Sequence, residues 1–251
     1  MLKPDDMTTP FSPGSQLALV TGSGHRLGKE IALRLARLGY AVAVHYHGSA
    51  EEAAHTQREI EQLGVKAFLF QADLTDPHQI ENLFKQIDQT GLPLSVLVNS
   101  ASVMLKGGLD DFDIADWDLT MNLNLRAVWQ CGILAFRRMQ NGGSIINISD
   151  SGAGRMWTGY AAYSISKAGV DVLTRLMART CAPAVRVNAV APGLILPPSD
   201  FSSETWDKLV NRLPLKRPGE PRFVCDAIEY LLSGEYITGE IITVDGGYQL
   251  V

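Results

Sequence analysis

The chain has 251 residues, of which 46% are hydrophobic, and carries a formal net charge of -5 at pH 7. This length and apolar content suffice for the core of one large domain. The acidic balance excludes broad electrostatic attraction to nucleic acid or to an anionic membrane, so a bound anion must be held by local contacts. No apolar run has the length needed to cross a bilayer. We therefore expect neither a nucleic-acid partner nor a membrane partner.

The cysteines Cys131, Cys181 and Cys225 lie far apart, without a CxxC pair and without histidines at the spacing of metal ligands. This pattern predicts reduced thiols, a cytoplasmic location and no metal site. Residues 1–15 are rich in Pro, Ser and Thr and lack the apolar stretch of a signal peptide, which indicates a flexible leader. We expect a single domain over residues 16–251.

Short apolar runs alternate with amphipathic stretches from residue 17 onward. Continuous apolar runs are typical of strands that helices cover on both faces. We predict strands at 17–21, 41–46, 66–72, 94–99, 144–149, 185–191 and 240–245. The alternation predicts an α/β fold with a doubly wound parallel sheet.

The predicted helices include one at 26–38, a charged surface helix at 50–63, and two longer ones at 114–139 and 160–181. Thr75, shortly before Pro77, is the expected N-cap of a further helix.

The stretch 193–213 follows the sixth predicted strand, near the end of the sheet where open α/β folds place their ligands. Its prolines, its serines and Trp206 suggest a lid over the substrate. The alternative is an ordinary surface loop that contains a buried tryptophan.

The sequence VTGSGHRLGKEIA, residues 20–32, leads from the first predicted strand into the first predicted helix. Gly22, Gly24 and Gly28 let the backbone approach a pyrophosphate at the helix N-terminus. The spacing is one residue longer than the common dinucleotide fingerprint. A tight turn that binds no ligand is the alternative interpretation.

The end of the second predicted strand indicates which dinucleotide is bound. A site that prefers NAD commonly offers a carboxylate about twenty residues after the glycines. Here residues 45–49 read HYHGS, without an acid. The donors of this segment, together with the guanidinium of Arg26, suit the 2′-phosphate of NADPH. The alternative for His45 and His47 is a pair of strand-end side chains bound to backbone.

Tyr163 and Lys167 stand four residues apart in a predicted helix, so their side chains share one face. An ammonium beside a phenol stabilises the phenolate, and we expect Lys167 to lower the pKa of Tyr163. Proton transfer from such a group contributes typically about 10²- to 10⁴-fold to an enzymatic rate.

Taken together, several motifs resemble the short-chain dehydrogenase/reductases in their order along the chain: TG-x5-G at 21–28, NSAS at 99–102, Asn124, Tyr163-xxx-Lys167 and Pro192-Gly193. The resemblance covers essentially the whole chain after the leader. It implies a Rossmann-like seven-stranded sheet and a nicotinamide cofactor. It also implies Tyr163 as the acid, Lys167 on the nicotinamide ribose, and Asn124 in support of a water relay.

One departure narrows the resemblance: Asp150 stands thirteen residues before Tyr163, where the family usually has a serine. With Arg26 and the closing VDGGYQL at 244–250, this looks like the pteridine reductases, including bacterial dihydromonapterin reductase. In that group the resemblance implies Arg26 and the His-x-Ser segment on the 2′-phosphate, and Asp150 joined to Tyr163.

The expected reaction is NADPH-dependent reduction of a dihydropterin, of the dihydromonapterin or dihydrobiopterin type, to the tetrahydro form, with dihydrofolate as a further candidate. A hydride would reach C6, and Tyr163, Lys167 and Asp150 would supply a proton to N5. Parasite pteridine reductases stack the pterin on an aromatic residue where this chain has Val103, Met104 and Leu105. Met104 is therefore either a pocket wall or core filling, and Trp206 is an alternative wall.

The resemblance assigns residues to three roles. The catalytic residues are Asp150, Tyr163, Lys167 and Asn124. The cofactor-binding residues are Gly22, His25, Arg26, Leu27, His45, His47, Gly48, Ser49, Asp73, Leu74, Asn99, Ser100, Ala101, Tyr163, Lys167, Pro192, Gly193 and Ile195. The substrate-binding residues are Ser102, Met104, Asp150, Tyr163, Leu194 and Trp206.

Two rival functions fit parts of the sequence. One is a ketone or quinone reductase, in which Asp150 is a harmless replacement. The other is a catalytically silent NADPH-binding regulator, which the complete set of Tyr163, Lys167 and Asn124 argues against. The resemblance also implies a homotetramer in which the helices at 114–139 and 160–181 pair across a dimer face.

Overall fold

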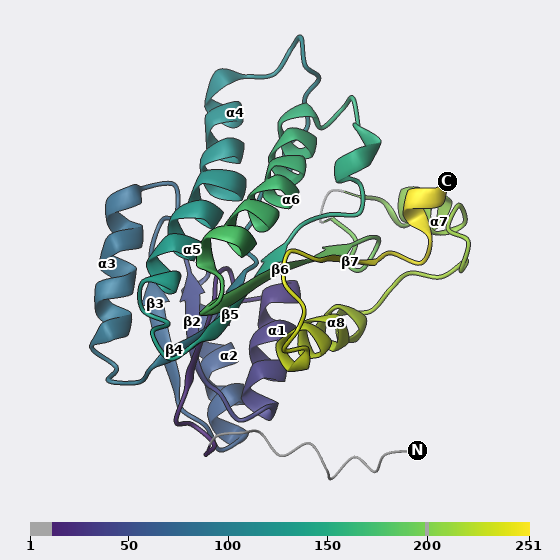
Figure 1. Cartoon of the computed structure of the whole chain (residues 1–251). Coiled ribbons are helices and arrows are strands. Elements are labelled where there is room, and N and C mark those ends of the chain that lie inside the picture. The colour runs from purple at the N-terminus through teal and green to yellow at the C-terminus, as the bar shows by residue number, and fades with distance from the viewer. Residues whose placement is uncertain (1–11, 199–200) are drawn as a thin grey trace.

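The computed structural model describes residues 12–198 and 201–251 (Figure 1). One sheet of seven parallel strands has the order β3-β2-β1-β4-β5-β6-β7. The strands are β1 (Leu17–Val20), β2 (Ala41–Tyr46), β3 (Ala67–Gln71), β4 (Leu94–Asn99), β5 (Gly143–Ile148), β6 (Val185–Pro192) and β7 (Ile241–Val244). The predicted doubly wound, Rossmann-like sheet is confirmed.

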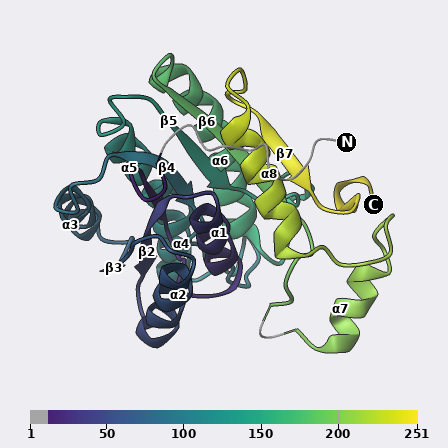
Figure 2. The same ribbon diagram turned by 90° about the horizontal axis from the view of Figure 1, so that it is seen from below.

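Helices cover both faces of the sheet (Figures 1 and 2). One face is covered by α1 (Arg26–Arg37), α2 (Ala50–Gln62) and α8 (Pro221–Ser233). The other is covered by α3 (Pro77–Asp88), α5 (Ala127–Phe136) and α6 (Ala161–Cys181). The remaining elements are α4 (Ile114–Met121), η2 (Asn122–Arg126), η3 (Ala153–Arg155), α7 (Ser203–Val210) and η4 (Tyr248–Leu250).

The alternation of side chains along a strand explains why the predicted strands are apolar throughout. In β1, Leu17 and Leu19 belong to the core beneath α3, α5 and α6. Ala18 and Val20 belong to the core beneath α1, α2 and α8. Because successive side chains point to opposite faces and both faces are covered, every position of β1 is buried.

Two predicted helix features differ from the structure. The N-cap of α3 is Asp76, not Thr75, because the Asp76 carboxylate accepts the N–H of His78 at 2.8 Å. The Thr75 hydroxyl donates instead to Asp73. The helix predicted at 114–139 consists of α4, the π-helical turn η2, and α5, and it ends at Phe136.

The predicted leader lies mostly outside the described residues, since only 12–15 of it are described. This part forms a turn in which the Gly14 N–H donates to the carbonyl of Gly39, just after α1, at 2.7 Å. Two residues of the predicted lid, 199 and 200, also lie outside the described part of the chain.

Candidate functional site

The site lies where the strand order changes direction, between β1 and β4. From β1 the chain continues through β2 and β3 toward one edge, and β4 begins the run toward the other. The Thr21 hydroxyl accepts the N–H groups of Ser100 at 2.9 Å and Ala101 at 3.1 Å. This side chain holds the turn after β1 against the loop after β4, at the switch point where doubly wound folds bind nucleotides.

Two of the three motif glycines are required by the backbone. Gly22 has φ of +66°, and a Cβ there would stand 2.9 Å from Cα of Ala101. A Cβ on Gly28 would stand only 2.1 Å from the carbonyl oxygen of Gly22. The first turn of α1 contains no acidic residue, and its N-cap, His25, makes no side-chain capping bond. The N-terminal N–H groups of α1 are thus suited to an anion such as a pyrophosphate.

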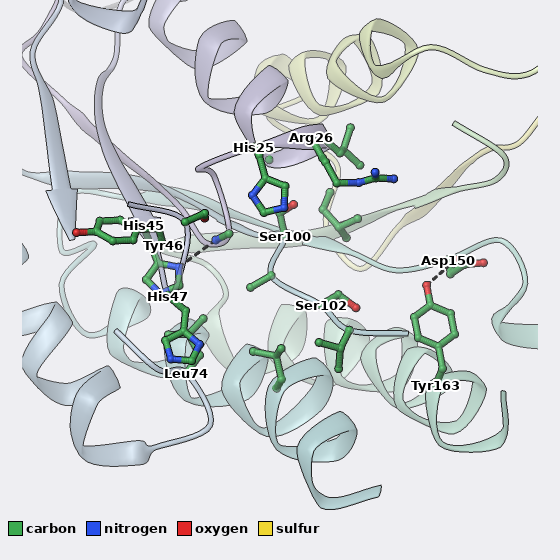
Figure 3. A pocket seen from close by; sticks show the side chains of 18 of the residues that line it. His25, Arg26, His45, Tyr46, His47, Leu74, Ser100, Ser102, Asp150 and Tyr163 are labelled. Atoms are coloured by element: carbon green, nitrogen blue, oxygen red, sulfur yellow. Dashed lines mark hydrogen bonds between the residues drawn. The ribbon is translucent and has the colours of Figure 1, made fainter. Parts of the chain in front are cut away.

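A cavity of about 770 Å³ runs along this edge of the sheet (Figure 3). It is lined by every residue predicted for the cofactor except Asn99. Asn99 is buried, and its Nδ2 donates to Oδ1 of Asn147 at 2.9 Å, so it joins β4 to β5 instead. The geometry therefore gathers the predicted cofactor residues around one elongated site that fits a dinucleotide.

The cavity has further lining residues that sequence reasoning missed. Leu119 and Leu123 come from α4 and η2, and Ser149 and Leu196 from the segments after β5 and β6. In the sequence, the spacing of Leu119 and Leu123 indicates only that the two side chains share one helix face. That this face meets the cavity depends on the packing of α4 and η2 in the fold.

His45 supports the glycine turn and is saturated by backbone groups. Its Nδ1 accepts the N–H of Gly22 at 3.0 Å, and its Nε2 donates to the carbonyl of Ala72 at 3.0 Å. Burial lowers the pKa of His45 to about 4, although the bond to Ala72 opposes this shift. His45 is therefore neutral at pH 7 with both nitrogens engaged by backbone groups, which matches the alternative interpretation of this side chain.

The lowered pKa of His45 makes stability depend on pH. The neutral form is favoured in the fold, so its stabilising contribution is complete above the unfolded pKa of about 6.5 and is lost as the pH falls toward 4. We expect this residue to remove about 3 kcal/mol from the free energy of unfolding between pH 7 and pH 4. Urea unfolding at several pH values should show a flatter pH dependence for His45→Gln than for the unchanged protein. Identical pH dependence would contradict this expectation.

The outer end of the cavity is formed by the segment after β2. His47 and Gly48 are exposed and Ser49 is half-buried, and all three line the cavity. The neighbouring carboxylate of Asp73 accepts the N–H and the hydroxyl of Thr75 at 2.8 and 2.7 Å. Desolvation opposes ionisation of Asp73, but these hydrogen bonds outweigh it and its pKa is lowered. Asp73 is therefore ionised at neutral pH.

Arg26 begins α1 with φ of +52°. Its side chain points away from His47, toward the end of the cavity that holds Asp150 and Tyr163 (Figure 3). Its Nη2 donates to the carbonyl of Pro197 at 2.8 Å. Arg26 lines the cavity as predicted, but its guanidinium is bonded to the loop after β6 and is not brought to the segment after β2.

Tyr163 and Asp150 meet at the inner end of the cavity. The Tyr163 hydroxyl donates to Oδ2 of Asp150 at 2.7 Å, and Oδ1 of Asp150 accepts the N–H of Gly152 at 2.6 Å (Figure 3). Lys167 lies four residues after Tyr163 on α6, with its ammonium 5.7 Å from the centre of the Tyr163 ring. Its Nζ donates to the carbonyl of Ile148 at 2.9 Å. The three residues that the sequence predicts to act together are therefore neighbours.

Burial dominates the electrostatics of this cluster. It raises the pKa of Asp150 and lowers that of Lys167 to about 8, and the attraction between the two opposes both shifts. Burial, followed by the charge of Asp150 and the hydrogen bond to it, raises the pKa of Tyr163 well above 10. The prediction that Lys167 lowers the pKa of Tyr163 is wrong, because burial and the carboxylate prevail. Tyr163 holds its proton at neutral pH.

Asn124 lies in the π-helical turn η2, fully buried. Its Oδ1 accepts the Val103 N–H at 2.9 Å and the Ser102 hydroxyl at 3.1 Å. Its Nδ2 donates to the Val103 carbonyl at 2.8 Å and the Ser166 hydroxyl at 3.2 Å. Both of its polar atoms are thus occupied by protein groups, and Asn124 fixes the 102–103 segment beside Tyr163.

Some of the predicted substrate residues line a cavity and others do not. Ser102 lines the main cavity with Asp150 and Tyr163, and Met104 lines an adjoining cavity of about 560 Å³ that Tyr160 and Phe201 also border. Leu194 and Trp206 border neither of these two cavities. The carbonyl of Leu194 accepts the N–H of Gly219, and Trp206 is half-buried in α7. Their assignment as substrate contacts is not supported by this geometry.

Within residues 12–198 and 201–251, no helix is long and apolar enough to span a membrane. In the same residues, no three His, Cys, Asp or Glu side chains are grouped so that they could hold a metal ion.

The fold and the site define a reductase of the dinucleotide-binding α/β class, and comparison with known proteins agrees. A family model described as enoyl-(acyl carrier protein) reductase matches residues 22–249. The 3-oxoacyl-[acyl-carrier-protein] reductase FabG of Staphylococcus aureus is 37% identical over 239 residues, covering 92% of this chain and 96% of that protein. The chain belongs to the short-chain dehydrogenase/reductase family and is an oxidoreductase.

Two solved structures are similar over nearly the whole chain. FolM alternative dihydrofolate reductase 1 from Brucella canis, complexed with NADP, superposes with a TM-score of 0.90 at 31% identity, covering 95% of each chain. A blue fluorescent protein from a metagenomic library, in complex with NADPH, superposes with a TM-score of 0.88 at 34% identity, covering 94% of this chain and 98% of that one.

Proposed function

We propose that this protein reduces a dihydropterin to its tetrahydro form with NADPH. The observation that carries the proposal is the carboxylate of Asp150, hydrogen-bonded at 2.7 Å to Tyr163 at the inner end of the cavity. The solved Brucella canis structure, named a dihydrofolate reductase and complexed with NADP, gives it support.

The residues at this end suit proton delivery to a ring nitrogen. Bound NADPH would supply the hydride, and reduction of the C6–N5 double bond of a dihydropterin also consumes one proton at N5. Tyr163 retains its proton at neutral pH, and the raised pKa of Asp150 makes it a better proton carrier than an exposed aspartate. A carboxylate also accepts hydrogen bonds from the aminopyrimidinone edge of a pterin, which a serine does less well. The ammonium of Lys167 places a positive charge 5.7 Å from the centre of the Tyr163 ring.

The substrate test is oxidation of NADPH followed at 340 nm with dihydromonapterin, dihydrobiopterin and dihydrofolate. Turnover of at least one of them is expected. If none is reduced while a carbonyl substrate is, the pterin proposal fails.

Reduction of a 3-oxoacyl thioester is the second candidate, favoured by the 37% identity to the Staphylococcus aureus FabG. Tyr163 and Lys167 would serve carbonyl reduction equally well, whereas Asp150 would have no particular task. Acetoacetyl-CoA, a ketone and a quinone, tested beside the three pterins, separate the two reactions.

The cofactor proposal rests on the segment after β2, which offers His47 and Ser49 without a carboxylate of its own. Gly48 is a place to test it, because a Cβ there would meet nothing within 4 Å. Gly48→Arg should lower the KM for NADPH, and Gly48→Asp should raise it about fivefold, from roughly 1 kcal/mol between unit charges 4 Å apart in water. The KM for NADH, which lacks the 2′-phosphate, should change much less in both variants. Equal effects on the two cofactors would contradict the placement of the phosphate.

We propose that the protein is a cytoplasmic homotetramer. Trp129 on α5 and Val172 and Leu176 on α6 are 50%, 57% and 57% exposed, which leaves an apolar surface on these two helices. Light scattering that reports a monomer would contradict the assembly.

A further inference from the structure

The indole of Trp157 stacks on the phenol ring of Tyr163. The ring centres are 6.4 Å apart and the planes differ by 3°, an offset parallel arrangement of the kind aromatic pairs favour. Trp157 also meets Tyr160 edge to face, with 6.4 Å between ring centres. Trp157 borders neither of the two cavities described above, so any effect on the reaction must pass through the residues on which it packs.

The same indole covers the turn that carries Asp150. A Cβ on Gly152 would stand 2.3 Å from Cζ2 of Trp157 and 2.9 Å from Oδ1 of Asp150. Gly152 is thus confined between the indole and the carboxylate, to which its N–H donates. One side chain therefore packs on Tyr163 and on the glycine whose N–H donates to the Asp150 carboxylate.

The C-terminal turn supports Trp157 from another side. Tyr248, which is buried, has its ring centre 6.1 Å from that of Trp157. The Arg155 guanidinium lies 4.4 Å from the centre of the Tyr248 ring and also donates to the Tyr248 carbonyl. The carboxylate of Asp245 accepts the N–H groups of Gly247 and Gln249, each at 2.8 Å, and so fixes the turn that presents Tyr248.

We propose that Trp157 is a positioning residue that holds the Tyr163 hydroxyl on Asp150, and that Tyr248 keeps Trp157 in place. Its effect on kcat is measured in the reductase reaction proposed above, and so rests on that function. Its physical basis is that the helix fixes the phenol ring only at its Cα, so the contacts around the ring must prevent rotation about its side-chain bonds. A flat partner parallel to the ring limits that rotation.

The test compares Trp157→Leu, which removes the ring, with Trp157→Phe, which keeps one. Trp157→Leu should lower kcat about three- to tenfold with the KM for NADPH within twofold of normal, and Trp157→Phe should restore most of the rate. Tyr248→Leu should lower kcat in the same direction by less. Matched controls are Trp117→Leu, whose indole packs on Phe112, and Tyr236→Leu, whose ring is fully exposed. Both should leave kcat unchanged.

A second readout requires no substrate. Tyrosines labelled with ¹³C at Cζ report ionisation by NMR, and the Tyr163 signal is identified by its loss in Tyr163→Phe. Opening the stack loosens the bond to Asp150, so Trp157→Leu should lower the pKa of Tyr163. A folded Trp157→Leu variant with unchanged kcat and unchanged Tyr163 titration would overturn the proposal. Should Trp157→Leu fail to fold, the titration of Tyr248→Leu decides in the same way. If the unchanged protein reduces no substrate, the proposed function fails, but the titration still tests this role.

Discussion

Tyr163→Phe is expected to reduce its substrate about 10²- to 10⁴-fold more slowly than the unchanged protein, the range typical of losing a general acid. The hydroxyl that donates to Asp150 is removed, while the ring that stacks on Trp157 remains. The site should therefore keep its shape and its affinity for NADPH. Steady-state rates at 340 nm and a fluorescence titration with NADPH check the two parts separately.

Lys167→Met provides a comparison, because it removes the ammonium that lies 5.7 Å from the centre of the Tyr163 ring while retaining a long side chain. Its rate should also fall, and its affinity for NADPH should fall with it if Lys167 binds the nicotinamide ribose. A Tyr163→Phe rate within tenfold of normal would show that another group delivers the proton.

Asp150→Ser is expected to lower kcat/KM for dihydropterins about 10²-fold or more, at the lower end of the range for a general acid. Serine is too short to replace both of the contacts that the carboxylate makes, with Tyr163 and with the N–H of Gly152. Reduction of a 3-oxoacyl thioester by the same variant should survive or improve, because serine is the usual residue of the family at this position. Rates of pterin reduction and of thioester reduction, measured on the unchanged protein and on Asp150→Ser, distinguish the two proposed substrates.

Asp150→Asn is the matched control, since it keeps the size and the hydrogen-bonding reach of the side chain but cannot carry the proton. If Asp150→Asn retains full pterin activity, the carboxyl only orients groups and does not carry a proton. If Asp150→Ser damages carbonyl and pterin reduction equally, Asp150 has no particular link to pterins.

The sheet could be predicted because its signal is local. Each strand is a short apolar run, and the core on both faces demands nothing more specific than apolar residues at consecutive positions. The cofactor turn was predictable from its glycine spacing, although only Gly28 is required by a contact within the turn and Gly22 is required by its φ and by Ala101. The pair of Tyr163 and Lys167 followed from helical spacing alone.

The errors arose where a side chain depends on partners distant in sequence. His45 is engaged by Gly22 and Ala72, which come from two other segments, so its sequence neighbours gave no sign of its role. The direction of Arg26 goes with its bond to Pro197, which is 171 residues away along the chain. The pKa of Tyr163 is decided by burial, which a spacing argument does not include. Trp157 was missed because its position depends on the C-terminal turn.

The three glycines of the nucleotide turn differ in how many amino acids each position can accept. Position 28 is restricted to one, since even the smallest side chain would overlap the backbone of Gly22. Position 22 is nearly as restricted, by its φ and by the backbone of Ala101. At position 24 the nearest atom to an added Cβ is the Ser49 hydroxyl, at 2.9 Å, which can rotate away. In a population of functional variants, glycine would therefore be invariant at 28, almost invariant at 22, and exchangeable with alanine at 24.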